Sequence, residues 1–477
     1  MKHILLFLLF SIACAAQNTT VLTEQTEIET NLLPLIAVKG QPAKTKTIEG
    51  LMKEFNVPGL SVAVIKNGKL HWTKGYGVSN TNTIQPVDEN TLFQAGSISK
   101  PLAALAALTL VQEGKVDLDE DVNEYLKDWK VPASDFTKEE KVTLRRLLSH
   151  TAGTTVHGFP GYTEKDKFPT ITEVLNGEGN TDKVFVDTEP GSNWRYSGGG
   201  YTIMEKLVED VSGMPLEIFM EKNIFPKIGM ENSTFYQPLP SNLKENASLA
   251  YNRKGKIIDK SYHNYPEQAA AGLWTTPSDL AKYIIEIRSI ANGKEDGVLS
   301  PETVNEMLTK HKGNWGLGPS LRNDGEELIF GHGGKNAGFT NNMIASVYNG
   351  DGIIILTSGD AGNEIINPLQ TTISKYYEMG IFEQQEIELY DIDEKDLLKF
   401  VGKYKYEEGE RKMIVEVKVK KGKINIKLGS NHVLDAIGPL EFFDLKDPET
   451  ITFSQDEQGS ITSFTLKGPG VSFARIE

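Results

Sequence analysis

Two β-hairpin patterns, far apart in the chain, constrain how its main part can fold. Apolar and polar residues alternate in LSVAVIKNGKLHWTKGYG (residues 60–77) around the turn dipeptide Asn67-Gly68, which is a strong hairpin signal. A second pattern of strand, glycine-rich turn and strand covers Asn341 to Gly359. The simplest architecture that accommodates both is one antiparallel sheet built from the two ends of this region.

Helical patterns fill the sequence between the two hairpins. They cover Leu144 to Leu148, Tyr201 to Val211 and Asp279 to Ile290, and TTPSDLAKYI (residues 275–284) has the capping hydroxyls and early acid of a helix start. The predicted fold class is therefore α/β, an antiparallel sheet flanked by helices with an inserted all-helical subdomain.

The composition changes after Gln384. Period-two alternation runs through Ile414 to Gly429 and again through Glu449 to Ile476, with frequent turn signals. This pattern predicts a small antiparallel β-domain, a lipocalin-like barrel or a sandwich. A chain of 477 residues is too long for one ordinary core. We expect a signal peptide (residues 1–16), a tether (17–45), a main domain (46–380), a linker (381–396) and a β-domain (397–477).

The N-terminal segment MKHILLFLLFSIACAAQ has the layout of a secretory signal. Lys2 precedes an apolar run from Ile4 to Ile12, and small residues follow, with a cleavage site expected near Ala15 or Ala16. This pattern predicts a secreted or periplasmic protein. The alternative is a buried N-terminal strand or helix. No other segment is apolar enough to cross a membrane.

The only cysteine, Cys14, lies inside the signal segment. The mature chain would then have no disulfide, no catalytic thiol and no thiolate metal ligand. A competing interpretation makes Cys14 a lipidated N-terminus, although Ser11 stands where lipoprotein signals usually have an aliphatic residue.

Charge and spacing exclude several function classes. The formal net charge of −15 argues against a nucleic-acid partner, which would need basic patches. The eight histidines show no metal-binding spacing, and the chain has neither a dinucleotide fingerprint nor a P-loop. We expect no metal, no cofactor and a small-molecule or peptide substrate, with the oligomeric state open.

The stretch FQAGSISKPLAALAAL (residues 93–108) carries a candidate nucleophile, Ser97, and a candidate base, Lys100. On a helix, a spacing of three places both side chains on one face. A lysine can accept the serine proton only if burial or a positive potential lowers its pKa. The alternative is an ordinary capped helix, since S-x-x-K also occurs at Ser241 to Lys244.

Two distant stretches strengthen the catalytic interpretation. Tyr196 stands before three glycines and a helical pattern, where a tyrosine could shuttle a proton. His332 begins a His-Gly-Gly sequence directly before the second hairpin, and glycines there would let a substrate lie against an edge strand. Considered separately, Tyr196 would more commonly be a buried structural residue and His332 a turn residue than catalytic groups.

Together these stretches resemble the serine β-lactamase and penicillin-binding-protein superfamily, whose members carry S-x-x-K. The resemblance covers roughly residues 46–378 and is closest to the class C β-lactamase-related group. That group includes D-alanyl carboxypeptidases, D-amino-acid peptidases and esterases. The matching stretches are SISKPLAALAALTLVQEGKVDLDEDV, LLSHTAGT, PGSNWRYSGGGY, AAAGLWTTPSDLAKY, and GHGG with AGF. The β-rich tail is similar to the small barrel that follows this domain in many relatives.

The resemblance implies a role for each matched residue. Ser97 would be the acylated nucleophile, Lys100 its base and Tyr196 the proton shuttle. The backbone N–H groups of Ser97 and Lys335 would form the oxyanion hole. His332 would line the pocket and orient the substrate or assist Tyr196. Gly334, Lys335 and Gly198 complete the expected substrate-binding set.

Two departures from the family pattern bear on the substrate. The second motif is usually Tyr-x-Asn, but here Gly198 replaces the asparagine that would hold an acyl-amide group. His332 replaces the lysine that could bind a substrate carboxylate. Both changes point away from efficient β-lactam hydrolysis.

The favoured hypothesis is a secreted serine hydrolase that acts through a Ser97 acyl-enzyme on esters, small amides or D-amino-acid peptides, including cell-wall fragments. One alternative is a non-catalytic peptide or peptidoglycan sensor with this fold. Another is a β-lactamase or D-Ala-D-Ala carboxypeptidase. An unrelated helical protein with a capped helix at Ser97 is the remaining alternative.

Overall fold

The structure is a computed structural model that describes residues 20–408, 411–446, 448–468 and 470–477. The predicted signal peptide and Cys14 therefore lie outside the described residues. The chain divides into two compact units. The first contains Lys46–Phe382 with the residues up to Leu32, and the second contains Leu33–Thr45 with Glu383–Glu477.

One antiparallel sheet organises the first unit, with the strand order β4-β3-β2-β10-β9-β8-β7. Both predicted hairpins are present, and β10 pairs with β2 so that Ile355 lies opposite Val62. The two ends of the region therefore share one sheet, as expected. The strands are β2 (Gly59–Lys66), β3 (Lys69–Asn80), β4 (Gln85–Pro86), β7 (Ser320–Arg322), β8 (Ile329–Asn336), β9 (Phe339–Ser346) and β10 (Gly352–Thr357).

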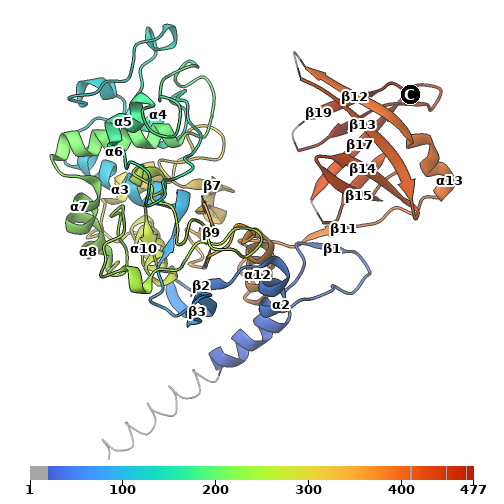
Figure 1. Cartoon of the computed structure of the whole chain (residues 1–477), viewed down its shortest axis with the longest axis horizontal. Coiled ribbons are helices and arrows are strands. Elements are labelled where there is room, and N and C mark those ends of the chain that lie inside the picture. The colour runs from blue at the N-terminus through green and yellow to red at the C-terminus, as the bar shows by residue number, and fades with distance from the viewer. Residues whose placement is uncertain (1–19, 409–410, 447, 469) are drawn as a thin grey trace, which may run out of the picture. The chain divides into compact units, whose positions relative to one another are not determined.

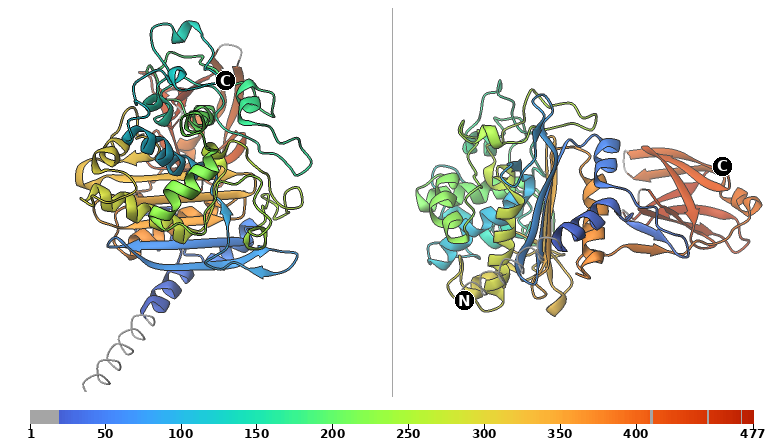
Figure 2. Two further views of the ribbon diagram at one scale, coloured as in Figure 1. Left: turned by 90° about the vertical axis from the view of Figure 1, so that its left-hand side faces the viewer. Right: turned by 90° about the horizontal axis from the view of Figure 1, so that it is seen from below.

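Both faces of this sheet are buried, because its central strands alternate between two apolar cores. On β2, Ala63 and Ile65 belong to one core, whereas Val62 and Val64 belong to the other. Side chains alternate along a strand, so an almost continuous apolar run serves both faces. Figure 2 shows the sheet edge-on in its right-hand view, with helices on both sides.

The helices are distributed unequally over the two faces. Residues of α2 (Ile48–Phe55) and α12 (Asn363–Tyr376) belong to one core. The larger core holds the predicted helical subdomain. Its helices are α3 (Ser99–Gln112), α4 (Leu144–Leu148), α5 (Ile171–Asn176), α6 (Gly198–Ser212), α7 (Leu216–Phe219), α8 (Phe225–Ile228), α9 (Gln268–Ala271), α10 (Pro277–Ala291) and α11 (Pro301–Met307).

Helix α3 runs through the middle of the larger core. Its residues from Ser99 to Leu110 are all buried, which suits a helix that is apolar all round. Alanine and leucine dominate it, so helix propensity and burial both favour a helix here. The helix therefore gives the adjoining Ser97 turn a rigid support.

The segment expected to be a tether is instead folded. Residues 20–30 are helical, and Ile28 and Leu32 are buried in the core that contains α2 and α12. Gln25 and Ile28 lie three residues apart on the buried face of this helix, and Leu32 follows its end. The sequence pattern did not predict this helix, because its buried face contains few apolar residues. Glu24 also accepts a hydrogen bond from the Tyr377 hydroxyl and lies 2.8 Å from His71 Nε2.

The second unit is a closed antiparallel barrel (Figure 1), which confirms the predicted small β-domain. Its strands are β12 (Gly402–Glu408), β13 (Arg411–Lys420), β14 (Lys423–Leu428), β15 (Ser430–Ala436), β16 (Glu441–Asp444), β17 (Glu449–Gln455), β18 (Ile461–Leu466) and β19 (Val471–Arg475). Phenylalanine rings dominate its core, where Phe400, Phe442 and Phe453 lie in mutual contact.

The predicted linker contains two short elements of its own. Strand β11 (Gln385–Ile387) pairs in parallel with β1 (Ile36–Val38), and α13 (Glu394–Leu397) follows. Across the described part of the chain, we find no helix with the length and hydropathy that a bilayer span requires.

Candidate active site

Ser97 lies on a single turn of 3-10 helix, η1 (Gly96–Ile98), directly before α3. Gly96 has a φ of +58°, and a Cβ atom there would lie 2.5 Å from the backbone nitrogen of Lys335 on β8. A side chain at this position would therefore push β8 away from the serine. Glycine allows the Ser97 turn and β8 to approach closely.

Lys100 reaches back from α3 to Ser97. Its Nζ atom lies 3.0 Å from the Ser97 Oγ atom and 2.8 Å from the Ala270 carbonyl oxygen. The side chain is buried, and burial lowers the pKa of its ammonium group from 10.5 to about 7. A lysine with this pKa is partly neutral at neutral pH, as a general base must be.

Tyr196 faces the same pair of residues, and it lines the cavity that contains Ser97. Lys100 Nζ lies 4.9 Å from the centre of its ring. Burial raises the pKa of the Tyr196 phenol above its ordinary value, while its hydrogen bond with Ser97 acts in the opposite direction. The phenol is therefore protonated and able to donate at neutral pH.

His332 is buried on β8, with its ring centre 6.1 Å from that of Tyr196. Burial, followed by the charge of Lys100, lowers the pKa of His332 to about 3. The ring is therefore neutral at working pH. Its Nδ1 atom contacts the Gly333 carbonyl oxygen, and its Nε2 atom has no hydrogen-bond partner among the described residues.

The backbone of β8 presents an open edge beside Ser97. The Ser320 hydroxyl donates to the Gly331 carbonyl oxygen at 2.8 Å, so that carbonyl points toward β7. Strand β7 pairs with β8 only as far as Gly331. Because backbone groups alternate in direction, the N–H of Lys335 points to the same edge, next to Gly96.

The other predicted binding residues fall into two groups. Gly334 lines the cavity, and a Cβ atom there would lie 1.9 Å from the Ala95 carbonyl oxygen, so this glycine lets β8 pack against the segment that precedes Ser97. Lys335 also lines the cavity, and its ammonium group pairs with Asp360 at 2.6 Å. Both positions therefore lie at the cavity that contains Ser97.

The structure does not support the predicted contact of Gly198 with substrate. Gly198 is buried at the start of α6, where a Cβ atom would approach Phe159 and the His157 carbonyl oxygen at about 3 Å. It is not one of the described residues that line the cavity. The residue is small because the neighbouring loop packs closely against the helix.

Aromatic residues that the sequence motifs do not include surround Tyr196. His150 is not among the predicted site residues, yet its ring centre lies 4.2 Å from that of Tyr196. Trp194, Trp315 and His157 line the cavity. No spacing rule connects these positions, because three separate loops bring them together.

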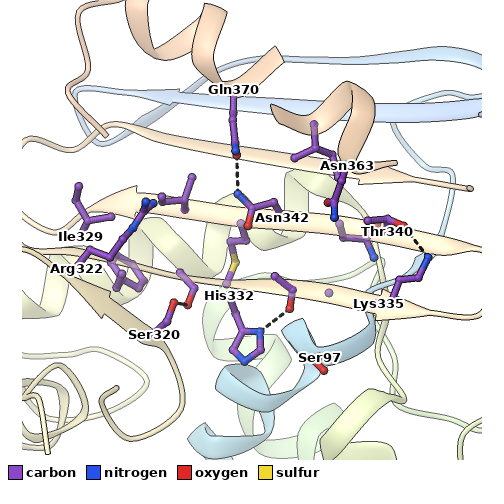
Figure 3. Close-up of a pocket in the computed structure, with 18 of the residues that line it drawn as sticks. Ser97, Ser320, Arg322, Ile329, His332, Lys335, Thr340, Asn342, Asn363 and Gln370 are labelled. Atoms are coloured by element: carbon purple, nitrogen blue, oxygen red, sulfur yellow. Dashed lines mark hydrogen bonds between the residues drawn. The ribbon is translucent and has the colours of Figure 1, made fainter. Parts of the chain in front are cut away.

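The cavity has a volume of about 680 Å³ and contains both Ser97 and Tyr196. Figure 3 shows Ser97 and His332 on one side of β8 and Asn342 and Gln370 on the other. Among the described residues, no three His, Asp or Glu side chains gather as metal ligands would.

Comparison with known proteins decides the family. Residues 45–371 match the family described as Beta-lactamase. This chain belongs to the Beta-lactamase family. It therefore has a serine hydrolase fold of this family, consistent with chemistry through an acyl-enzyme.

Two curated relatives are informative. A Beta-lactamase of Pseudomonas fluorescens is 30% identical over 238 residues, which are 50% of this chain and 62% of that protein. Protein flp of Staphylococcus aureus (strain N315) is 22% identical over 319 residues, 66% of this chain and 62% of that protein. The chain thus covers about three-fifths of the length of each relative.

Solved structures share the Beta-lactamase-family fold. The octameric penicillin-binding protein homologue from Pyrococcus abyssi has a TM-score of 0.60 and 22% identity, with coverage of 90% of this chain and 98% of that one. SurE in complex with D-Leu has a TM-score of 0.56 and 20% identity, with coverage of 90% and 97%. At these identities the likeness concerns the fold.

Proposed function

We propose that the protein is a secreted or periplasmic serine hydrolase that cleaves esters, small amides or D-amino-acid peptides through an acyl-enzyme on Ser97. The observation that carries the proposal is the contact between Lys100 Nζ and Ser97 Oγ, at 3.0 Å. Burial of Lys100 supplies the neutral amine that the first step needs.

In acylation, neutral Lys100 accepts the Ser97 proton while Oγ attacks the substrate carbonyl carbon. The carbonyl oxygen becomes an oxyanion held by the N–H groups of Ser97 and Lys335. Collapse of the tetrahedral intermediate breaks the bond to the leaving group. That group takes a proton from the Tyr196 hydroxyl, which is in turn reprotonated by Lys100.

Deacylation reverses these roles with water as the nucleophile. Water loses a proton toward Tyr196 and Lys100, attacks the acyl carbon, and the bond to Ser97 Oγ breaks. Ser97 then regains its proton from Lys100. Two observations support this relay, since Lys100 Nζ contacts Ser97 Oγ and lies 4.9 Å from the centre of the Tyr196 ring.

The cavity supports a neutral or weakly polar substrate near the serine. His332 is uncharged there, and Lys335 is paired with Asp360. Position 332 therefore supplies no cation beside Ser97, as a lysine there would. The complex of SurE with D-Leu motivates the inclusion of D-leucyl amides among the substrates to be tried.

A fluorophosphonate probe tests the proposal directly. Intact mass spectrometry and peptide mapping should locate one adduct on Ser97, and p-nitrophenyl acetate should be hydrolysed. Ser97→Ala should abolish both results. Ser241→Ala is the matched control, because Ser241 begins the exposed second S-x-x-K copy, and it should behave as wild type.

Absence of both adduct and turnover in the wild type would refute the hydrolase proposal. Peptide binding that survives Ser97→Ala in such a protein would instead favour the sensor.

A further inference from the structure

The cavity extends past the catalytic residues and around the edge of β8. His332 and Gly334 face the core that contains α3, whereas Gly333 and Lys335 face α12. Lining residues are found on both sides of the strand. The α12 face of β8 has no part in the acyl-transfer chemistry described above.

Gly333 leaves this second face open. A Cβ atom at Gly333 would have no neighbour closer than 3.9 Å, and the nearest side-chain atom would be Asn342 Oδ1 at 4.0 Å. Gly331, Gly334 and Gly96, by contrast, would each bring a Cβ atom to within 2.5 Å of backbone atoms. Close packing explains those three glycines, but it does not explain Gly333.

The wall above Gly333 consists of uncharged amides. Asn342 on β9 donates through Nδ2 to Gln370 Oε1 at 2.7 Å, and Gln370 Nε2 lies 3.3 Å from Asn367 Oδ1. These bonds orient the Asn342 amide with its Oδ1 atom toward the open space over Gly333. Figure 3 shows this pair above the strand.

The charges around this space disfavour a cationic ligand group. Arg322 on β7 lines the same cavity, Lys335 is already paired with Asp360, and no described lining residue is an aspartate or glutamate. A neutral hydrogen-bond donor of the ligand could pair with Asn342 Oδ1. A ligand without such a donor would remove water from this oxygen and leave it unpaired.

An extended chain along the open edge of β8 would place its side chains alternately on the two faces. Residues directly opposite each other in a sheet share a face, so the substrate residue opposite Gly333 would point toward Asn342. We propose that Gly333, Asn342 and Gln370 form a side-chain subsite that accepts an amide or hydroxyl group of a peptide substrate. The proposal rests on the proposed function and refines its substrate class.

Binding to the Ser97→Ala variant tests the subsite without turnover. The probes are N-acetylated, C-amidated pentaalanine peptides, in L and D series, with a single Gln or a single Met at each position in turn. Gln and Met have similar size, but only Gln can donate to Asn342. Calorimetry should find one position where Gln binds at least about fivefold more tightly than Met.

Second substitutions in the Ser97→Ala background locate the preference. Gly333→Val fills the open space, and Asn342→Leu removes the acceptor, so each should abolish the preference for Gln. Asn305→Leu, on an exposed position of α11, is the control and should retain it. Thermal unfolding of each variant shows whether a loss of binding follows from a loss of fold.

The subsite is refuted if no position distinguishes Gln from Met, if no peptide binds, or if Gly333→Val keeps the preference in a folded protein. Failure of the proposed function is separate, because it would show as a lack of fluorophosphonate labelling at Ser97. A preference at one position in a protein that is never labelled would uphold the subsite and refute the hydrolase.

Discussion

Glu205 on α6 accepts a hydrogen bond from the backbone N–H of Ala269 at 2.8 Å, one residue before the carbonyl that binds Lys100. Tyr196 lies just before the same helix α6. The carboxyl group thus connects α6, which follows Tyr196, to the short helix α9 that positions the base. Burial raises the pKa of Glu205 well above its ordinary value, which favours the neutral form of its carboxyl group.

This contact makes Glu205 a positioning residue with a clear test. Glu205→Leu leaves the Ala269 N–H buried without its acceptor and should destabilise the fold by about 1–3 kcal/mol. Loss of the Ala270 contact should slow acylation of Ser97 about tenfold. Glu205→Gln keeps a neutral acceptor and should restore most of the rate. Equal loss in both variants, measured by ester hydrolysis, would contradict this role.

Lys100 sets the expected pH dependence of acylation. Its pKa of about 7 means that the neutral amine increases as the pH rises through 7, so kcat/KM for an ester should rise over the same range. Lys100→Met should lower that rate by at least about 100-fold. A pH profile that is flat from about pH 5.5 to 9 would refute the assignment of Lys100 as base.

Burial of Lys100 should lower the free energy of unfolding. Its native pKa lies below the unfolded value of 10.5, so below pH 7 the folded state buries a charge that prefers water. The penalty should fade as the pH rises from 7 to 10.5, because only the unfolded state still binds the proton there. Lys100→Met should therefore raise the melting temperature most at low pH, as measured by calorimetric scans.

His332 should not govern the acid limb of the activity profile. Burial and Lys100 lower its pKa to about 3, so the ring stays neutral across the working range. The His332→Gln variant should show a pH–rate profile whose acid midpoint stays near the wild-type value, even where its rate is lower. Loss of the limb, or a shift of more than about one pH unit, would instead identify His332 as the titrating group.

Gly334 should be the least replaceable glycine of β8. A Cβ atom at this position would lie 1.9 Å from the Ala95 carbonyl oxygen, so Gly334→Ala must displace the strand or the Ser97 turn. We expect a loss of about 1–3 kcal/mol in the free energy of unfolding. Gly333→Ala is the control for stability, since its Cβ atom meets open space. Equal melting temperatures of the two variants would contradict the close approach.

Local patterns predicted the fold well where they were strongly periodic. The Asn67-Gly68 hairpin, the helix over residues 144–148 and the alternating C-terminal strands are all present. The helix over residues 20–30 was missed because polar residues such as Gln25 occupy part of its buried face. Its burial depends on the sheet that it covers, which local periodicity does not report.

The sequence by itself determined the residue types of the site and their family pattern: Ser97 with Lys100, then Tyr196, then His332. Their spacing of three, from the η1 turn into the first turn of α3, is enough to bring the first two together. Only the tertiary structure decided their surroundings. The pKa of Lys100 depends on burial by segments remote in sequence, such as Ala270, and the open space over Gly333 depends on where β9 and α12 lie. Desolvation and free volume are properties of the packed chain.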